Sequence, residues 1–182
     1  MQFQRRSKRT VYANPWISFE AHEIVHPNGR AGEHGLVATP PASAVVVYDD
    51  GFVWLTRQAR FAIDRVVLEV VKGGAELGET PLAAAQRETR EEIGVEAGRW
   101  DVLGTAYELP SLIDHTVSLF LARDLRRVAT EHESVESIET VRMVFSAAVE
   151  AALNGQLEDA ITGLALLRAA QLISRDAGEH NR

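Results

Sequence analysis

The sequence contains no cysteine, and it has no long apolar run. The lack of cysteine excludes disulfide bonds, thiolate metal sites and cysteine nucleophiles. No apolar stretch approaches the length of a membrane span, so we expect no association with a membrane. The first residues, MQFQRRSKRTVY, are basic and lack the apolar region of a secretory signal. We therefore expect a soluble, cytoplasmic protein.

Positive charge is also in short supply. The 182 residues include 19 lysines and arginines against 26 aspartates and glutamates, which gives a net charge of −7. This balance argues against a general affinity for nucleic acid. An anionic substrate would need cations supplied locally, either by arginines or by a metal ion. The length and the 46% hydrophobic content fit a single domain over residues 1–182 with a sizeable core.

The N-terminal third of the chain predicts a small antiparallel sheet over residues 10–40. Its strands are expected at Thr10–Ala13, Trp16–Val25 and Gly35–Thr39, and the sequence HPNGR between the last two predicts a turn. Residues 1–8 are polar and basic, and we expect a frayed tail there unless a partner covers it.

Residues 41–175 predict further strands and three helices. The β-branched or alternating segments that predict strands are Ala44–Tyr48, Phe52–Gln58, Val66–Val71, Asp101–Glu108, Thr116–Ala122 and Ile138–Phe145. One helix follows Thr80, a second has Ser146 as its cap, and a third covers Glu158–Arg175. We expect the tail after Arg175 to be poorly ordered.

The helix within the stretch Gly73–Val95 has clear start and stop signals. Thr80 suits the N-cap, Pro81 suits the first helical position, and Gly94 suits the left-handed residue that ends a helix. At about 100° per residue, one stripe of this helix faces the core and consists of Leu82, Ala85, Thr89 and Ile93. Three carboxylates fall beside that stripe, from Glu88, Glu91 and Glu92.

Such crowding of like charges destabilises a helix unless something neutralises it. Three carboxylates on one side form a hard-oxygen site that suits Mg²⁺ or Mn²⁺. The backbone at Gly73 and Gly74 can approach a ligand or a metal closely because it carries no side chains. The alternative is an acidic surface helix with solvated glutamates. The fixed register of the glycines, Glu79 and the Arg-Glu pair argues against that alternative.

The stretch resembles the Nudix signature, which runs Gly, five residues, Glu, seven residues, Arg-Glu, an apolar residue, any residue, Glu-Glu, any residue, Gly and an apolar residue. The positions that match are Gly73, Glu79, Arg87, Glu88, Glu91, Glu92, Gly94 and Val95. The one departure is Thr89 at the apolar position, whose hydroxyl we expect to donate to the Ala85 carbonyl.

Other segments resemble the ADP-ribose and nucleotide-sugar pyrophosphatase branch of that family, among them NPWI, AVVVY, RQARF, LEVVKGG and FLARDL. The resemblance implies an α/β fold, a Nudix-type α/β/α sandwich with a mixed β-sheet, plus the small N-terminal antiparallel sheet. It also implies a homodimer in which the N-terminal sheet, residues 10–40, exchanges between subunits, and a Nudix core over residues 41–175.

The resemblance assigns roles to residues inside and outside the signature. The metal ligands would be Glu88, Glu91 and Glu92, with the main-chain carbonyl of Lys72. Arg87 would orient the catalytic glutamates, Glu79 would support the loop, and Gly73 and Gly94 would shape the motif. The general base would be a glutamate of the acidic loop, with Glu136 preferred, Glu133 second, and the alternatives Glu131, Glu139, His115 and His132.

Substrate contacts are expected outside the helix. Arg57 and Arg60 follow the end of a strand and could bind phosphate or ribose oxygens bidentately. Trp16 is a candidate for stacking on a nucleobase, whereas Trp54 belongs to the core. The resemblance adds Pro110, sixteen residues after Gly94, together with its neighbour Ser111, which stands where the branch often has glycine.

The activity implied is Mg²⁺-dependent hydrolysis of the diphosphate linkage of a nucleoside diphosphate derivative, with Mn²⁺ as the other candidate cofactor. The first candidate substrate is ADP-ribose, which would give AMP and ribose 5-phosphate. The alternatives are a nucleotide sugar of the GDP-mannose or UDP-glucose type, NADH and dinucleoside polyphosphates. A different class, a non-catalytic ligand sensor with this fold, is disfavoured because every acidic residue of the signature is present.

Overall fold

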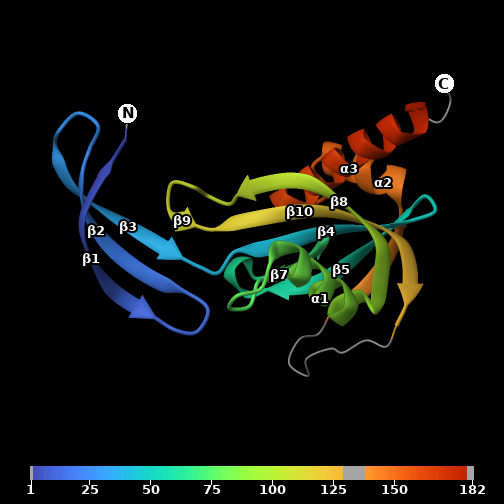
Figure 1. Cartoon of the computed structure of the whole chain (residues 1–182), viewed down its shortest axis with the longest axis horizontal. Coiled ribbons are helices and arrows are strands. Elements are labelled where there is room, and N and C mark those ends of the chain that lie inside the picture. The colour runs from blue at the N-terminus through green and yellow to red at the C-terminus, as the bar shows by residue number, and fades with distance from the viewer. Residues whose placement is uncertain (1, 129–137, 180–182) are drawn as a thin grey trace. The chain divides into compact units, whose positions relative to one another are not determined.

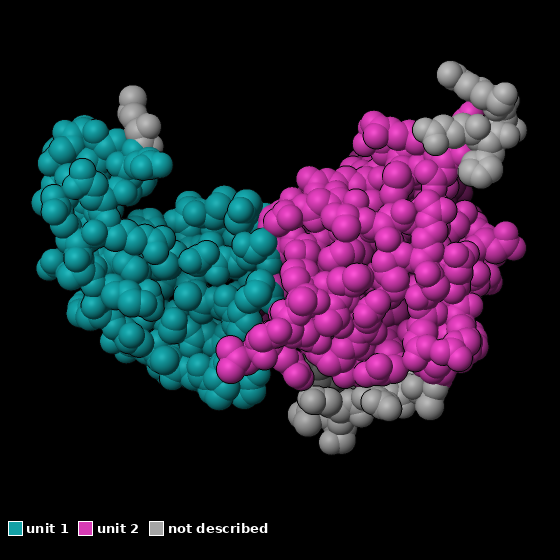
Figure 2. Space-filling model, viewed as in Figure 1, with its two compact units in different colours: residues 1–41, 107–116 teal, residues 42–106, 117–182 magenta. Residues whose placement is uncertain are grey.

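The computed structural model describes residues 2–128 and 138–179. The acidic-loop candidates Glu131, His132, Glu133 and Glu136 lie outside the described residues. The chain divides into two compact units, residues 1–41 with 107–116, and residues 42–106 with 117–182 (Figure 2). The first unit therefore combines the N-terminal residues with a second segment, 107–116. The single-domain assignment stays a prediction.

The N-terminal unit is a four-stranded sheet in the order β1 (Gln4–Ala13), β2 (Ser18–Val25), β3 (Ala31–Ala38), β9 (Ile113–Asp114) (Figure 1). The first three strands pair antiparallel as expected, and β9 adds a parallel pair with β3. The expected frayed tail is wrong, because β1 begins at Gln4 and pairs with β2 as far as Ala13. All ten residues of β1 are nevertheless exposed to solvent.

The larger unit contains a seven-stranded sheet. Its main order is β11 (Glu139–Val144), β5 (Phe52–Arg60), β4 (Ala42–Asp49), β10 (Thr116–Arg127) and β8 (Val95–Tyr107), with β6 (Arg65–Glu69) on β5 and β7 (Val71–Gly74) on β4. The β10–β4 pair is parallel and the β4–β5 pair is antiparallel. The sheet is therefore mixed, as the sequence predicted.

Helices cover both faces of this sheet, which confirms the α/β/α sandwich (Figure 1). Residues of β4 alternate between two cores. Ala44 and Val46 pack with α2 (Phe145–Leu153) and α3 (Ala160–Glu179), whereas Val45 and Val47 pack with α1 (Pro81–Ile93). A short 3₁₀ helix, Phe61–Ile63, links β5 to β6. None of the helices in the described part of the chain is long and apolar enough to cross a membrane.

The predicted single strand Val66–Val71 is two strands. β6 pairs with β5 and β7 pairs with β4, so the chain changes partner at Val70. The reason is visible at Val70, whose amide donates to the hydroxyl of Thr162 in α3 at 3.0 Å instead of to a neighbouring strand. Gly73 and Gly74 form the end of β7, opposite Ser43 and Ala42 respectively.

Two helix ends also differ from expectation. Ser146 is not a cap, because α2 already begins at Phe145 after Val144 and no side chain caps it. The C-terminal tail continues α3 as far as Glu179. Asp176 lies in that last part of the helix and accepts from Arg123 at 2.7 Å and from Arg99 at 3.2 Å. These ion pairs connect the end of α3 to β10 and β8.

Candidate active site

The ends of α1 are set by the residues that the sequence suggested. Thr80 has an extended backbone, and its hydroxyl accepts from Ala83 N at 3.2 Å, while Pro81 occupies the first turn. Gly94 ends the helix in the left-handed conformation at φ +70°, with its N–H bonded to Arg90 O. Both signals therefore specify the helix, and with it the direction in which the glutamates point.

One face of α1 is buried against the sheet, as predicted for Ala85, Thr89 and Ile93. The hydroxyl of Thr89 donates to Ala85 O at 2.7 Å, so this fully buried polar group is satisfied within the helix. Leu82 was assigned to the same stripe wrongly, because it is 39% exposed in the first turn. Glu92 lies on the buried side and is only 7% exposed.

Arg87 connects the carboxylates of the helix to the preceding loop. Its Nε and Nη2 donate to the two oxygens of Glu79 at 3.1 Å each. Its Nη1 donates to Glu88 Oε1 at 2.7 Å and to Glu91 Oε2 at 2.9 Å, and Nη2 also donates to Gly74 O at 2.8 Å. The bonds with Glu79 are the main reason that the pKa of Arg87 is raised above its usual range, and they lower the pKa of Glu79.

Gly73 lies directly against the carboxyl group of Glu88. A Cβ placed on Gly73 would be 2.0 Å from Glu88 Cδ, whereas a Cβ on Gly74 would meet nothing within 4 Å. Only glycine can therefore occupy position 73 while the Glu88 carboxylate keeps its place. The backbone of β7 and the carboxylate of α1 are thus packed together without an intervening side chain.

The chemistry of this region suits a hard divalent cation. Glu88, Glu91 and Glu92 offer carboxylate oxygens, and the main chain of β7 at Gly73 lies against the Glu88 carboxylate. Within residues 2–128 and 138–179, however, no group of three or more acidic or histidine side chains converges closely enough to hold a metal ion. Glu88 and Glu91 are instead both hydrogen-bonded to Arg87.

Arg57 and Arg60, the expected phosphate-binding residues, each contact a carboxylate. Arg57 Nη1 donates to the two oxygens of Glu139 at 3.1 and 2.9 Å, between neighbouring exposed positions of β5 and β11. Arg60 donates through Nε and Nη2 to Glu69, whose side chain is 4% exposed. Burial lowers the pKa of Arg60, but the bond with Glu69 and nearby carboxylate charges outweigh it and raise the pKa overall.

The sequence-based interpretation missed a partly buried ion-pair network that involves Lys72 of β7. Lys72 Nζ donates to Asp159 Oδ1 at 2.9 Å and lies 3.7 Å from Glu69 Oε1. Asp159 Oδ2 accepts from the amide and the hydroxyl of Thr162 at 2.8 and 2.7 Å. Two signals could have revealed it. A lone acid inside the apolar strand VVLEVV needs a partner, and an Asp directly before an apolar helix suits an N-cap.

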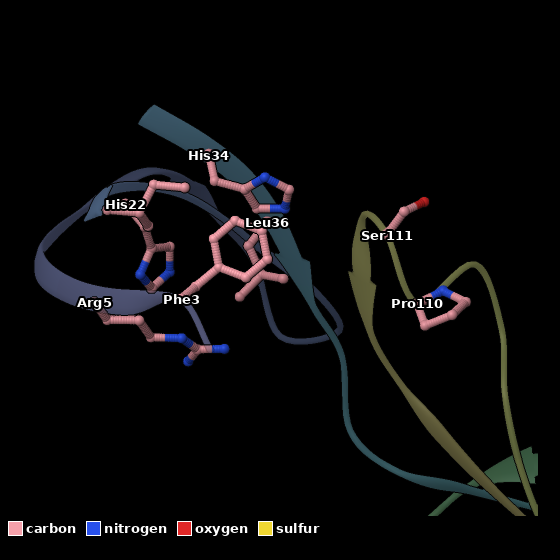
Figure 3. A pocket seen from close by; sticks show the side chains of 8 residues that line it. Phe3, Arg5, His22, His34, Leu36, Pro110 and Ser111 are labelled. Carbon is pink, nitrogen blue, oxygen red and sulfur yellow. The ribbon is translucent and has the colours of Figure 1, made fainter. Parts of the chain in front are cut away.

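The remaining substrate-contact candidates belong to the N-terminal unit. Trp16 is 73% exposed. Pro110 and Ser111 line a cavity of about 240 Å³ within this unit, opposite side chains from β2, β3 and the start of the chain (Figure 3). The labelled residues there include Phe3, Arg5, His22, His34 and Leu36. The structure therefore divides the predicted site residues between the two units.

Comparisons with known proteins agree with the signature and with the two-part division. Residues 38–180 match the NUDIX domain, and residues 3–37 match the nucleoside diphosphate sugar hydrolase N-terminal domain. An ADP-ribose pyrophosphatase from Bacillus subtilis is 28% identical over 88% of this chain and 88% of its own length. An ADP-ribose pyrophosphatase from Mycobacterium tuberculosis is 30% identical over 74% of this chain and 67% of its own length.

A solved structure agrees with the fold. The crystal structure of an ADP compounds hydrolase superposes with a TM-score of 0.85 at 22% sequence identity, and the match covers 97% of this chain and 96% of the other. Three observations therefore indicate the same family: the Nudix signature, the α/β/α sandwich that carries it, and a domain match over most of the chain. The chain belongs to the Nudix family of hydrolases, and its similarity falls in the ADP-ribose and nucleotide-sugar pyrophosphatase branch.

Proposed function

We propose that this protein hydrolyses the diphosphate linkage of ADP-ribose in a Mg²⁺-dependent reaction that yields AMP and ribose 5-phosphate. The observation that carries the proposal is the close packing of Gly73 against the Glu88 carboxylate. This contact brings the carboxylate of Glu88 in α1 against the main chain of β7. The names of the Bacillus and Mycobacterium relatives support ADP-ribose as the first candidate.

Glu88, Glu91, Glu92 and the carbonyl of Lys72 are the groups that would hold the metal. A bound Mg²⁺ would neutralise the diphosphate oxygens and lower the pKa of a bound water. Arg87 restrains Glu88 and Glu91 from one side, and Glu79 holds Arg87 in turn. The general base stays assigned to Glu136, with Glu133 second, both outside the described residues.

Arg57 and Arg60 retain donors for an anionic substrate. Arg57 contacts Glu139 through Nη1, and Arg60 contacts Glu69 through Nε and Nη2. The carboxylates therefore orient the two guanidinium groups without occupying every N–H. Trp16 would stack on the base, and Pro110 and Ser111 would border the substrate.

A nucleotide sugar is the second candidate substrate. The match of residues 3–37 to the N-terminal domain of nucleoside diphosphate sugar hydrolases favours it specifically. Both candidates contain a nucleoside diphosphate, so the same metal and arginine chemistry would serve either one.

We further propose that the protein is a homodimer joined through the N-terminal sheet. β1 is an edge strand, and every residue in it is exposed, including Val11 at 48% and Tyr12 at 55%. An open edge with exposed apolar side chains is a surface that proteins ordinarily cover. A second copy of this chain is the occupant that the resemblance to the pyrophosphatase branch implies.

A hydrolysis panel tests the substrate. The full chain would be incubated with Mg²⁺ or Mn²⁺ and ADP-ribose, GDP-mannose, UDP-glucose, NADH or diadenosine polyphosphates, and the products separated by chromatography. The proposal predicts the highest kcat/KM for ADP-ribose, with AMP and ribose 5-phosphate as products. A higher kcat/KM for UDP-glucose or GDP-mannose would replace it with the second candidate. No turnover of any diphosphate would favour a ligand sensor.

A further inference from the structure

The main chain from Val70 to Gly74 must be placed accurately for the proposed site to work. Gly73 leaves the space that the Glu88 carboxylate occupies, and the main-chain carbonyl of Lys72 is one of the proposed metal ligands. The strand β7 is only four residues long, and it pairs with β4 from Val71 to Gly74. Its position therefore depends on what supports it away from that pairing.

The N-terminal end of α3 supplies that support. The amide of Val70 donates to Thr162 Oγ1 at 3.0 Å, and Thr162 is fully buried. Lys72 Nζ donates to Asp159 Oδ1 at 2.9 Å, with side chains that are 16% and 14% exposed. The helix itself is anchored in the core by four residues that are at most 4% exposed, Ile161, Ala165, Leu166 and Ala169.

The two carboxylate oxygens of Asp159 bond to different partners, one in α3 and one in β7. Oδ2 accepts from the amide and hydroxyl of Thr162, which fixes the carboxylate at the start of the helix. Oδ1 is then directed at the ammonium group of Lys72. A carboxylate held by a buried helix at one oxygen and by a strand at the other is a rigid link between the two.

We propose that Asp159 is a positioning residue that, through Lys72 and Thr162, places the Val70–Gly74 main chain against the glutamates of α1. The inference rests on the proposed function, because the groups that it positions are the proposed metal ligands. Asp159 is hydrogen-bonded to Lys72 and to Thr162. Its effect would therefore pass through Lys72 and the strand.

Two substitutions separate this role from a purely stabilising one. Asp159→Asn can keep one oxygen on Thr162 but turns an NH₂ donor toward the ammonium group of Lys72, so the helix cap survives while the link is lost. Lys72→Met removes the same link from the other side and keeps the length of the side chain. Asp176→Asn is the matched control, because it removes ion pairs with Arg123 and Arg99 at the far end of the same helix.

The test measures Mn²⁺ binding by electron paramagnetic resonance of the free ion, together with amide hydrogen exchange of residues 71–74 and steady-state kinetics. Partners that orient metal ligands typically change metal affinity by about 10- to 100-fold. We expect Asp159→Asn and Lys72→Met each to weaken Mn²⁺ binding about tenfold, to speed exchange at 71–74 and to lower kcat with little change in KM. The variant that carries both substitutions should bind Mn²⁺ no more weakly than the single variant with the lower Mn²⁺ affinity.

The control decides between positioning and stability. Asp176→Asn should lower Tm yet keep wild-type Mn²⁺ affinity and wild-type exchange at residues 71–74. Wild-type Mn²⁺ affinity and exchange in Asp159→Asn, with a lower Tm alone, would overturn the inference. A wild-type protein that binds Mn²⁺ but hydrolyses no diphosphate would refute the proposed function, and the binding and exchange comparison would still decide the role of Asp159.

Discussion

The Glu88 carboxyl group can pack against the main chain at Gly73 because glycine has no side chain. The carboxyl carbon of Glu88 occupies the place that a Cβ at position 73 would need, at a separation of 2.0 Å. The glycine is therefore required by the packing of the acid and not by an unusual backbone angle. Its neighbour Gly74 has open space where a Cβ would lie. Packing therefore requires glycine at position 73 but not at position 74.

Gly73→Ala should impair the proposed site, whereas Gly74→Ala should be tolerated. The new methyl group would force Glu88 away from its place, and a displacement of about 1 Å in a catalytic constellation can cost about 100-fold in rate. We expect a loss of about that size in kcat for Gly73→Ala. Less than a threefold difference between the two variants would contradict the importance of this contact.

Glu79 should give stability a dependence on acid pH. Its bond with Arg87 lowers its pKa in the folded protein below the ordinary value of 4.5. A carboxyl whose pKa is lowered by folding contributes stability that is fully present above its unfolded pKa and is lost as pH falls through the folded pKa. Urea unfolding of wild type and Glu79→Gln should therefore differ most near neutral pH and converge below pH 4.5. A difference that stays constant across that range would show that the pair has no such linkage.

Helix α1 shows which parts of the structure local sequence signals determine. Thr80, Pro81 and Gly94 act within one turn of their own positions, so they could be identified without any tertiary information. The division between β6 and β7 could not, because it depends on Thr162, which lies 92 residues further along the chain. The carboxylate partners of Arg57 and Arg60 were missed for the same reason, since strand pairing brings them together.

The N-cap of α1 can be tested by itself. Thr80→Ala removes the acceptor for Ala83 N, and loss of such a cap costs about 1 kcal/mol in the free energy of unfolding. Thr80→Ser retains a hydroxyl at the same place and should keep most of that stability. Equal urea midpoints for Thr80→Ala and wild type would mean that the cap contributes nothing measurable.

For the whole molecule, the family and the fold followed from one long motif, while the substrate did not. The signature specifies residues whose spacing is fixed by a single loop and helix. The substrate contacts come from distant segments, and Trp16, Pro110 and Ser111 fall in a different compact unit from the glutamates. No local pattern records how such segments combine, which is why the reaction class was more predictable than the nucleotide.

We predict that the whole molecule is a homodimer. The exposed strand β1 should be covered by a second copy, so light scattering after size exclusion should give about twice the chain mass of 20.0 kDa. Replacing the exposed Val11 and Tyr12 by lysine should shift the protein toward the monomer, because charge on an edge strand opposes pairing. A wild-type protein that is monomeric at micromolar concentration would refute the dimer.

The central claim is that α1 carries a metal-dependent hydrolytic site, and Glu92→Gln tests it most directly. The variant keeps the shape of the side chain but removes its charge, and Glu96→Gln, which affects an exposed partner of Arg126, is the control. With saturating Mg²⁺ and ADP-ribose, we expect kcat to fall by about 100-fold or more for Glu92→Gln and to stay near wild type for Glu96→Gln. Equal turnover by wild type and Glu92→Gln would contradict the account.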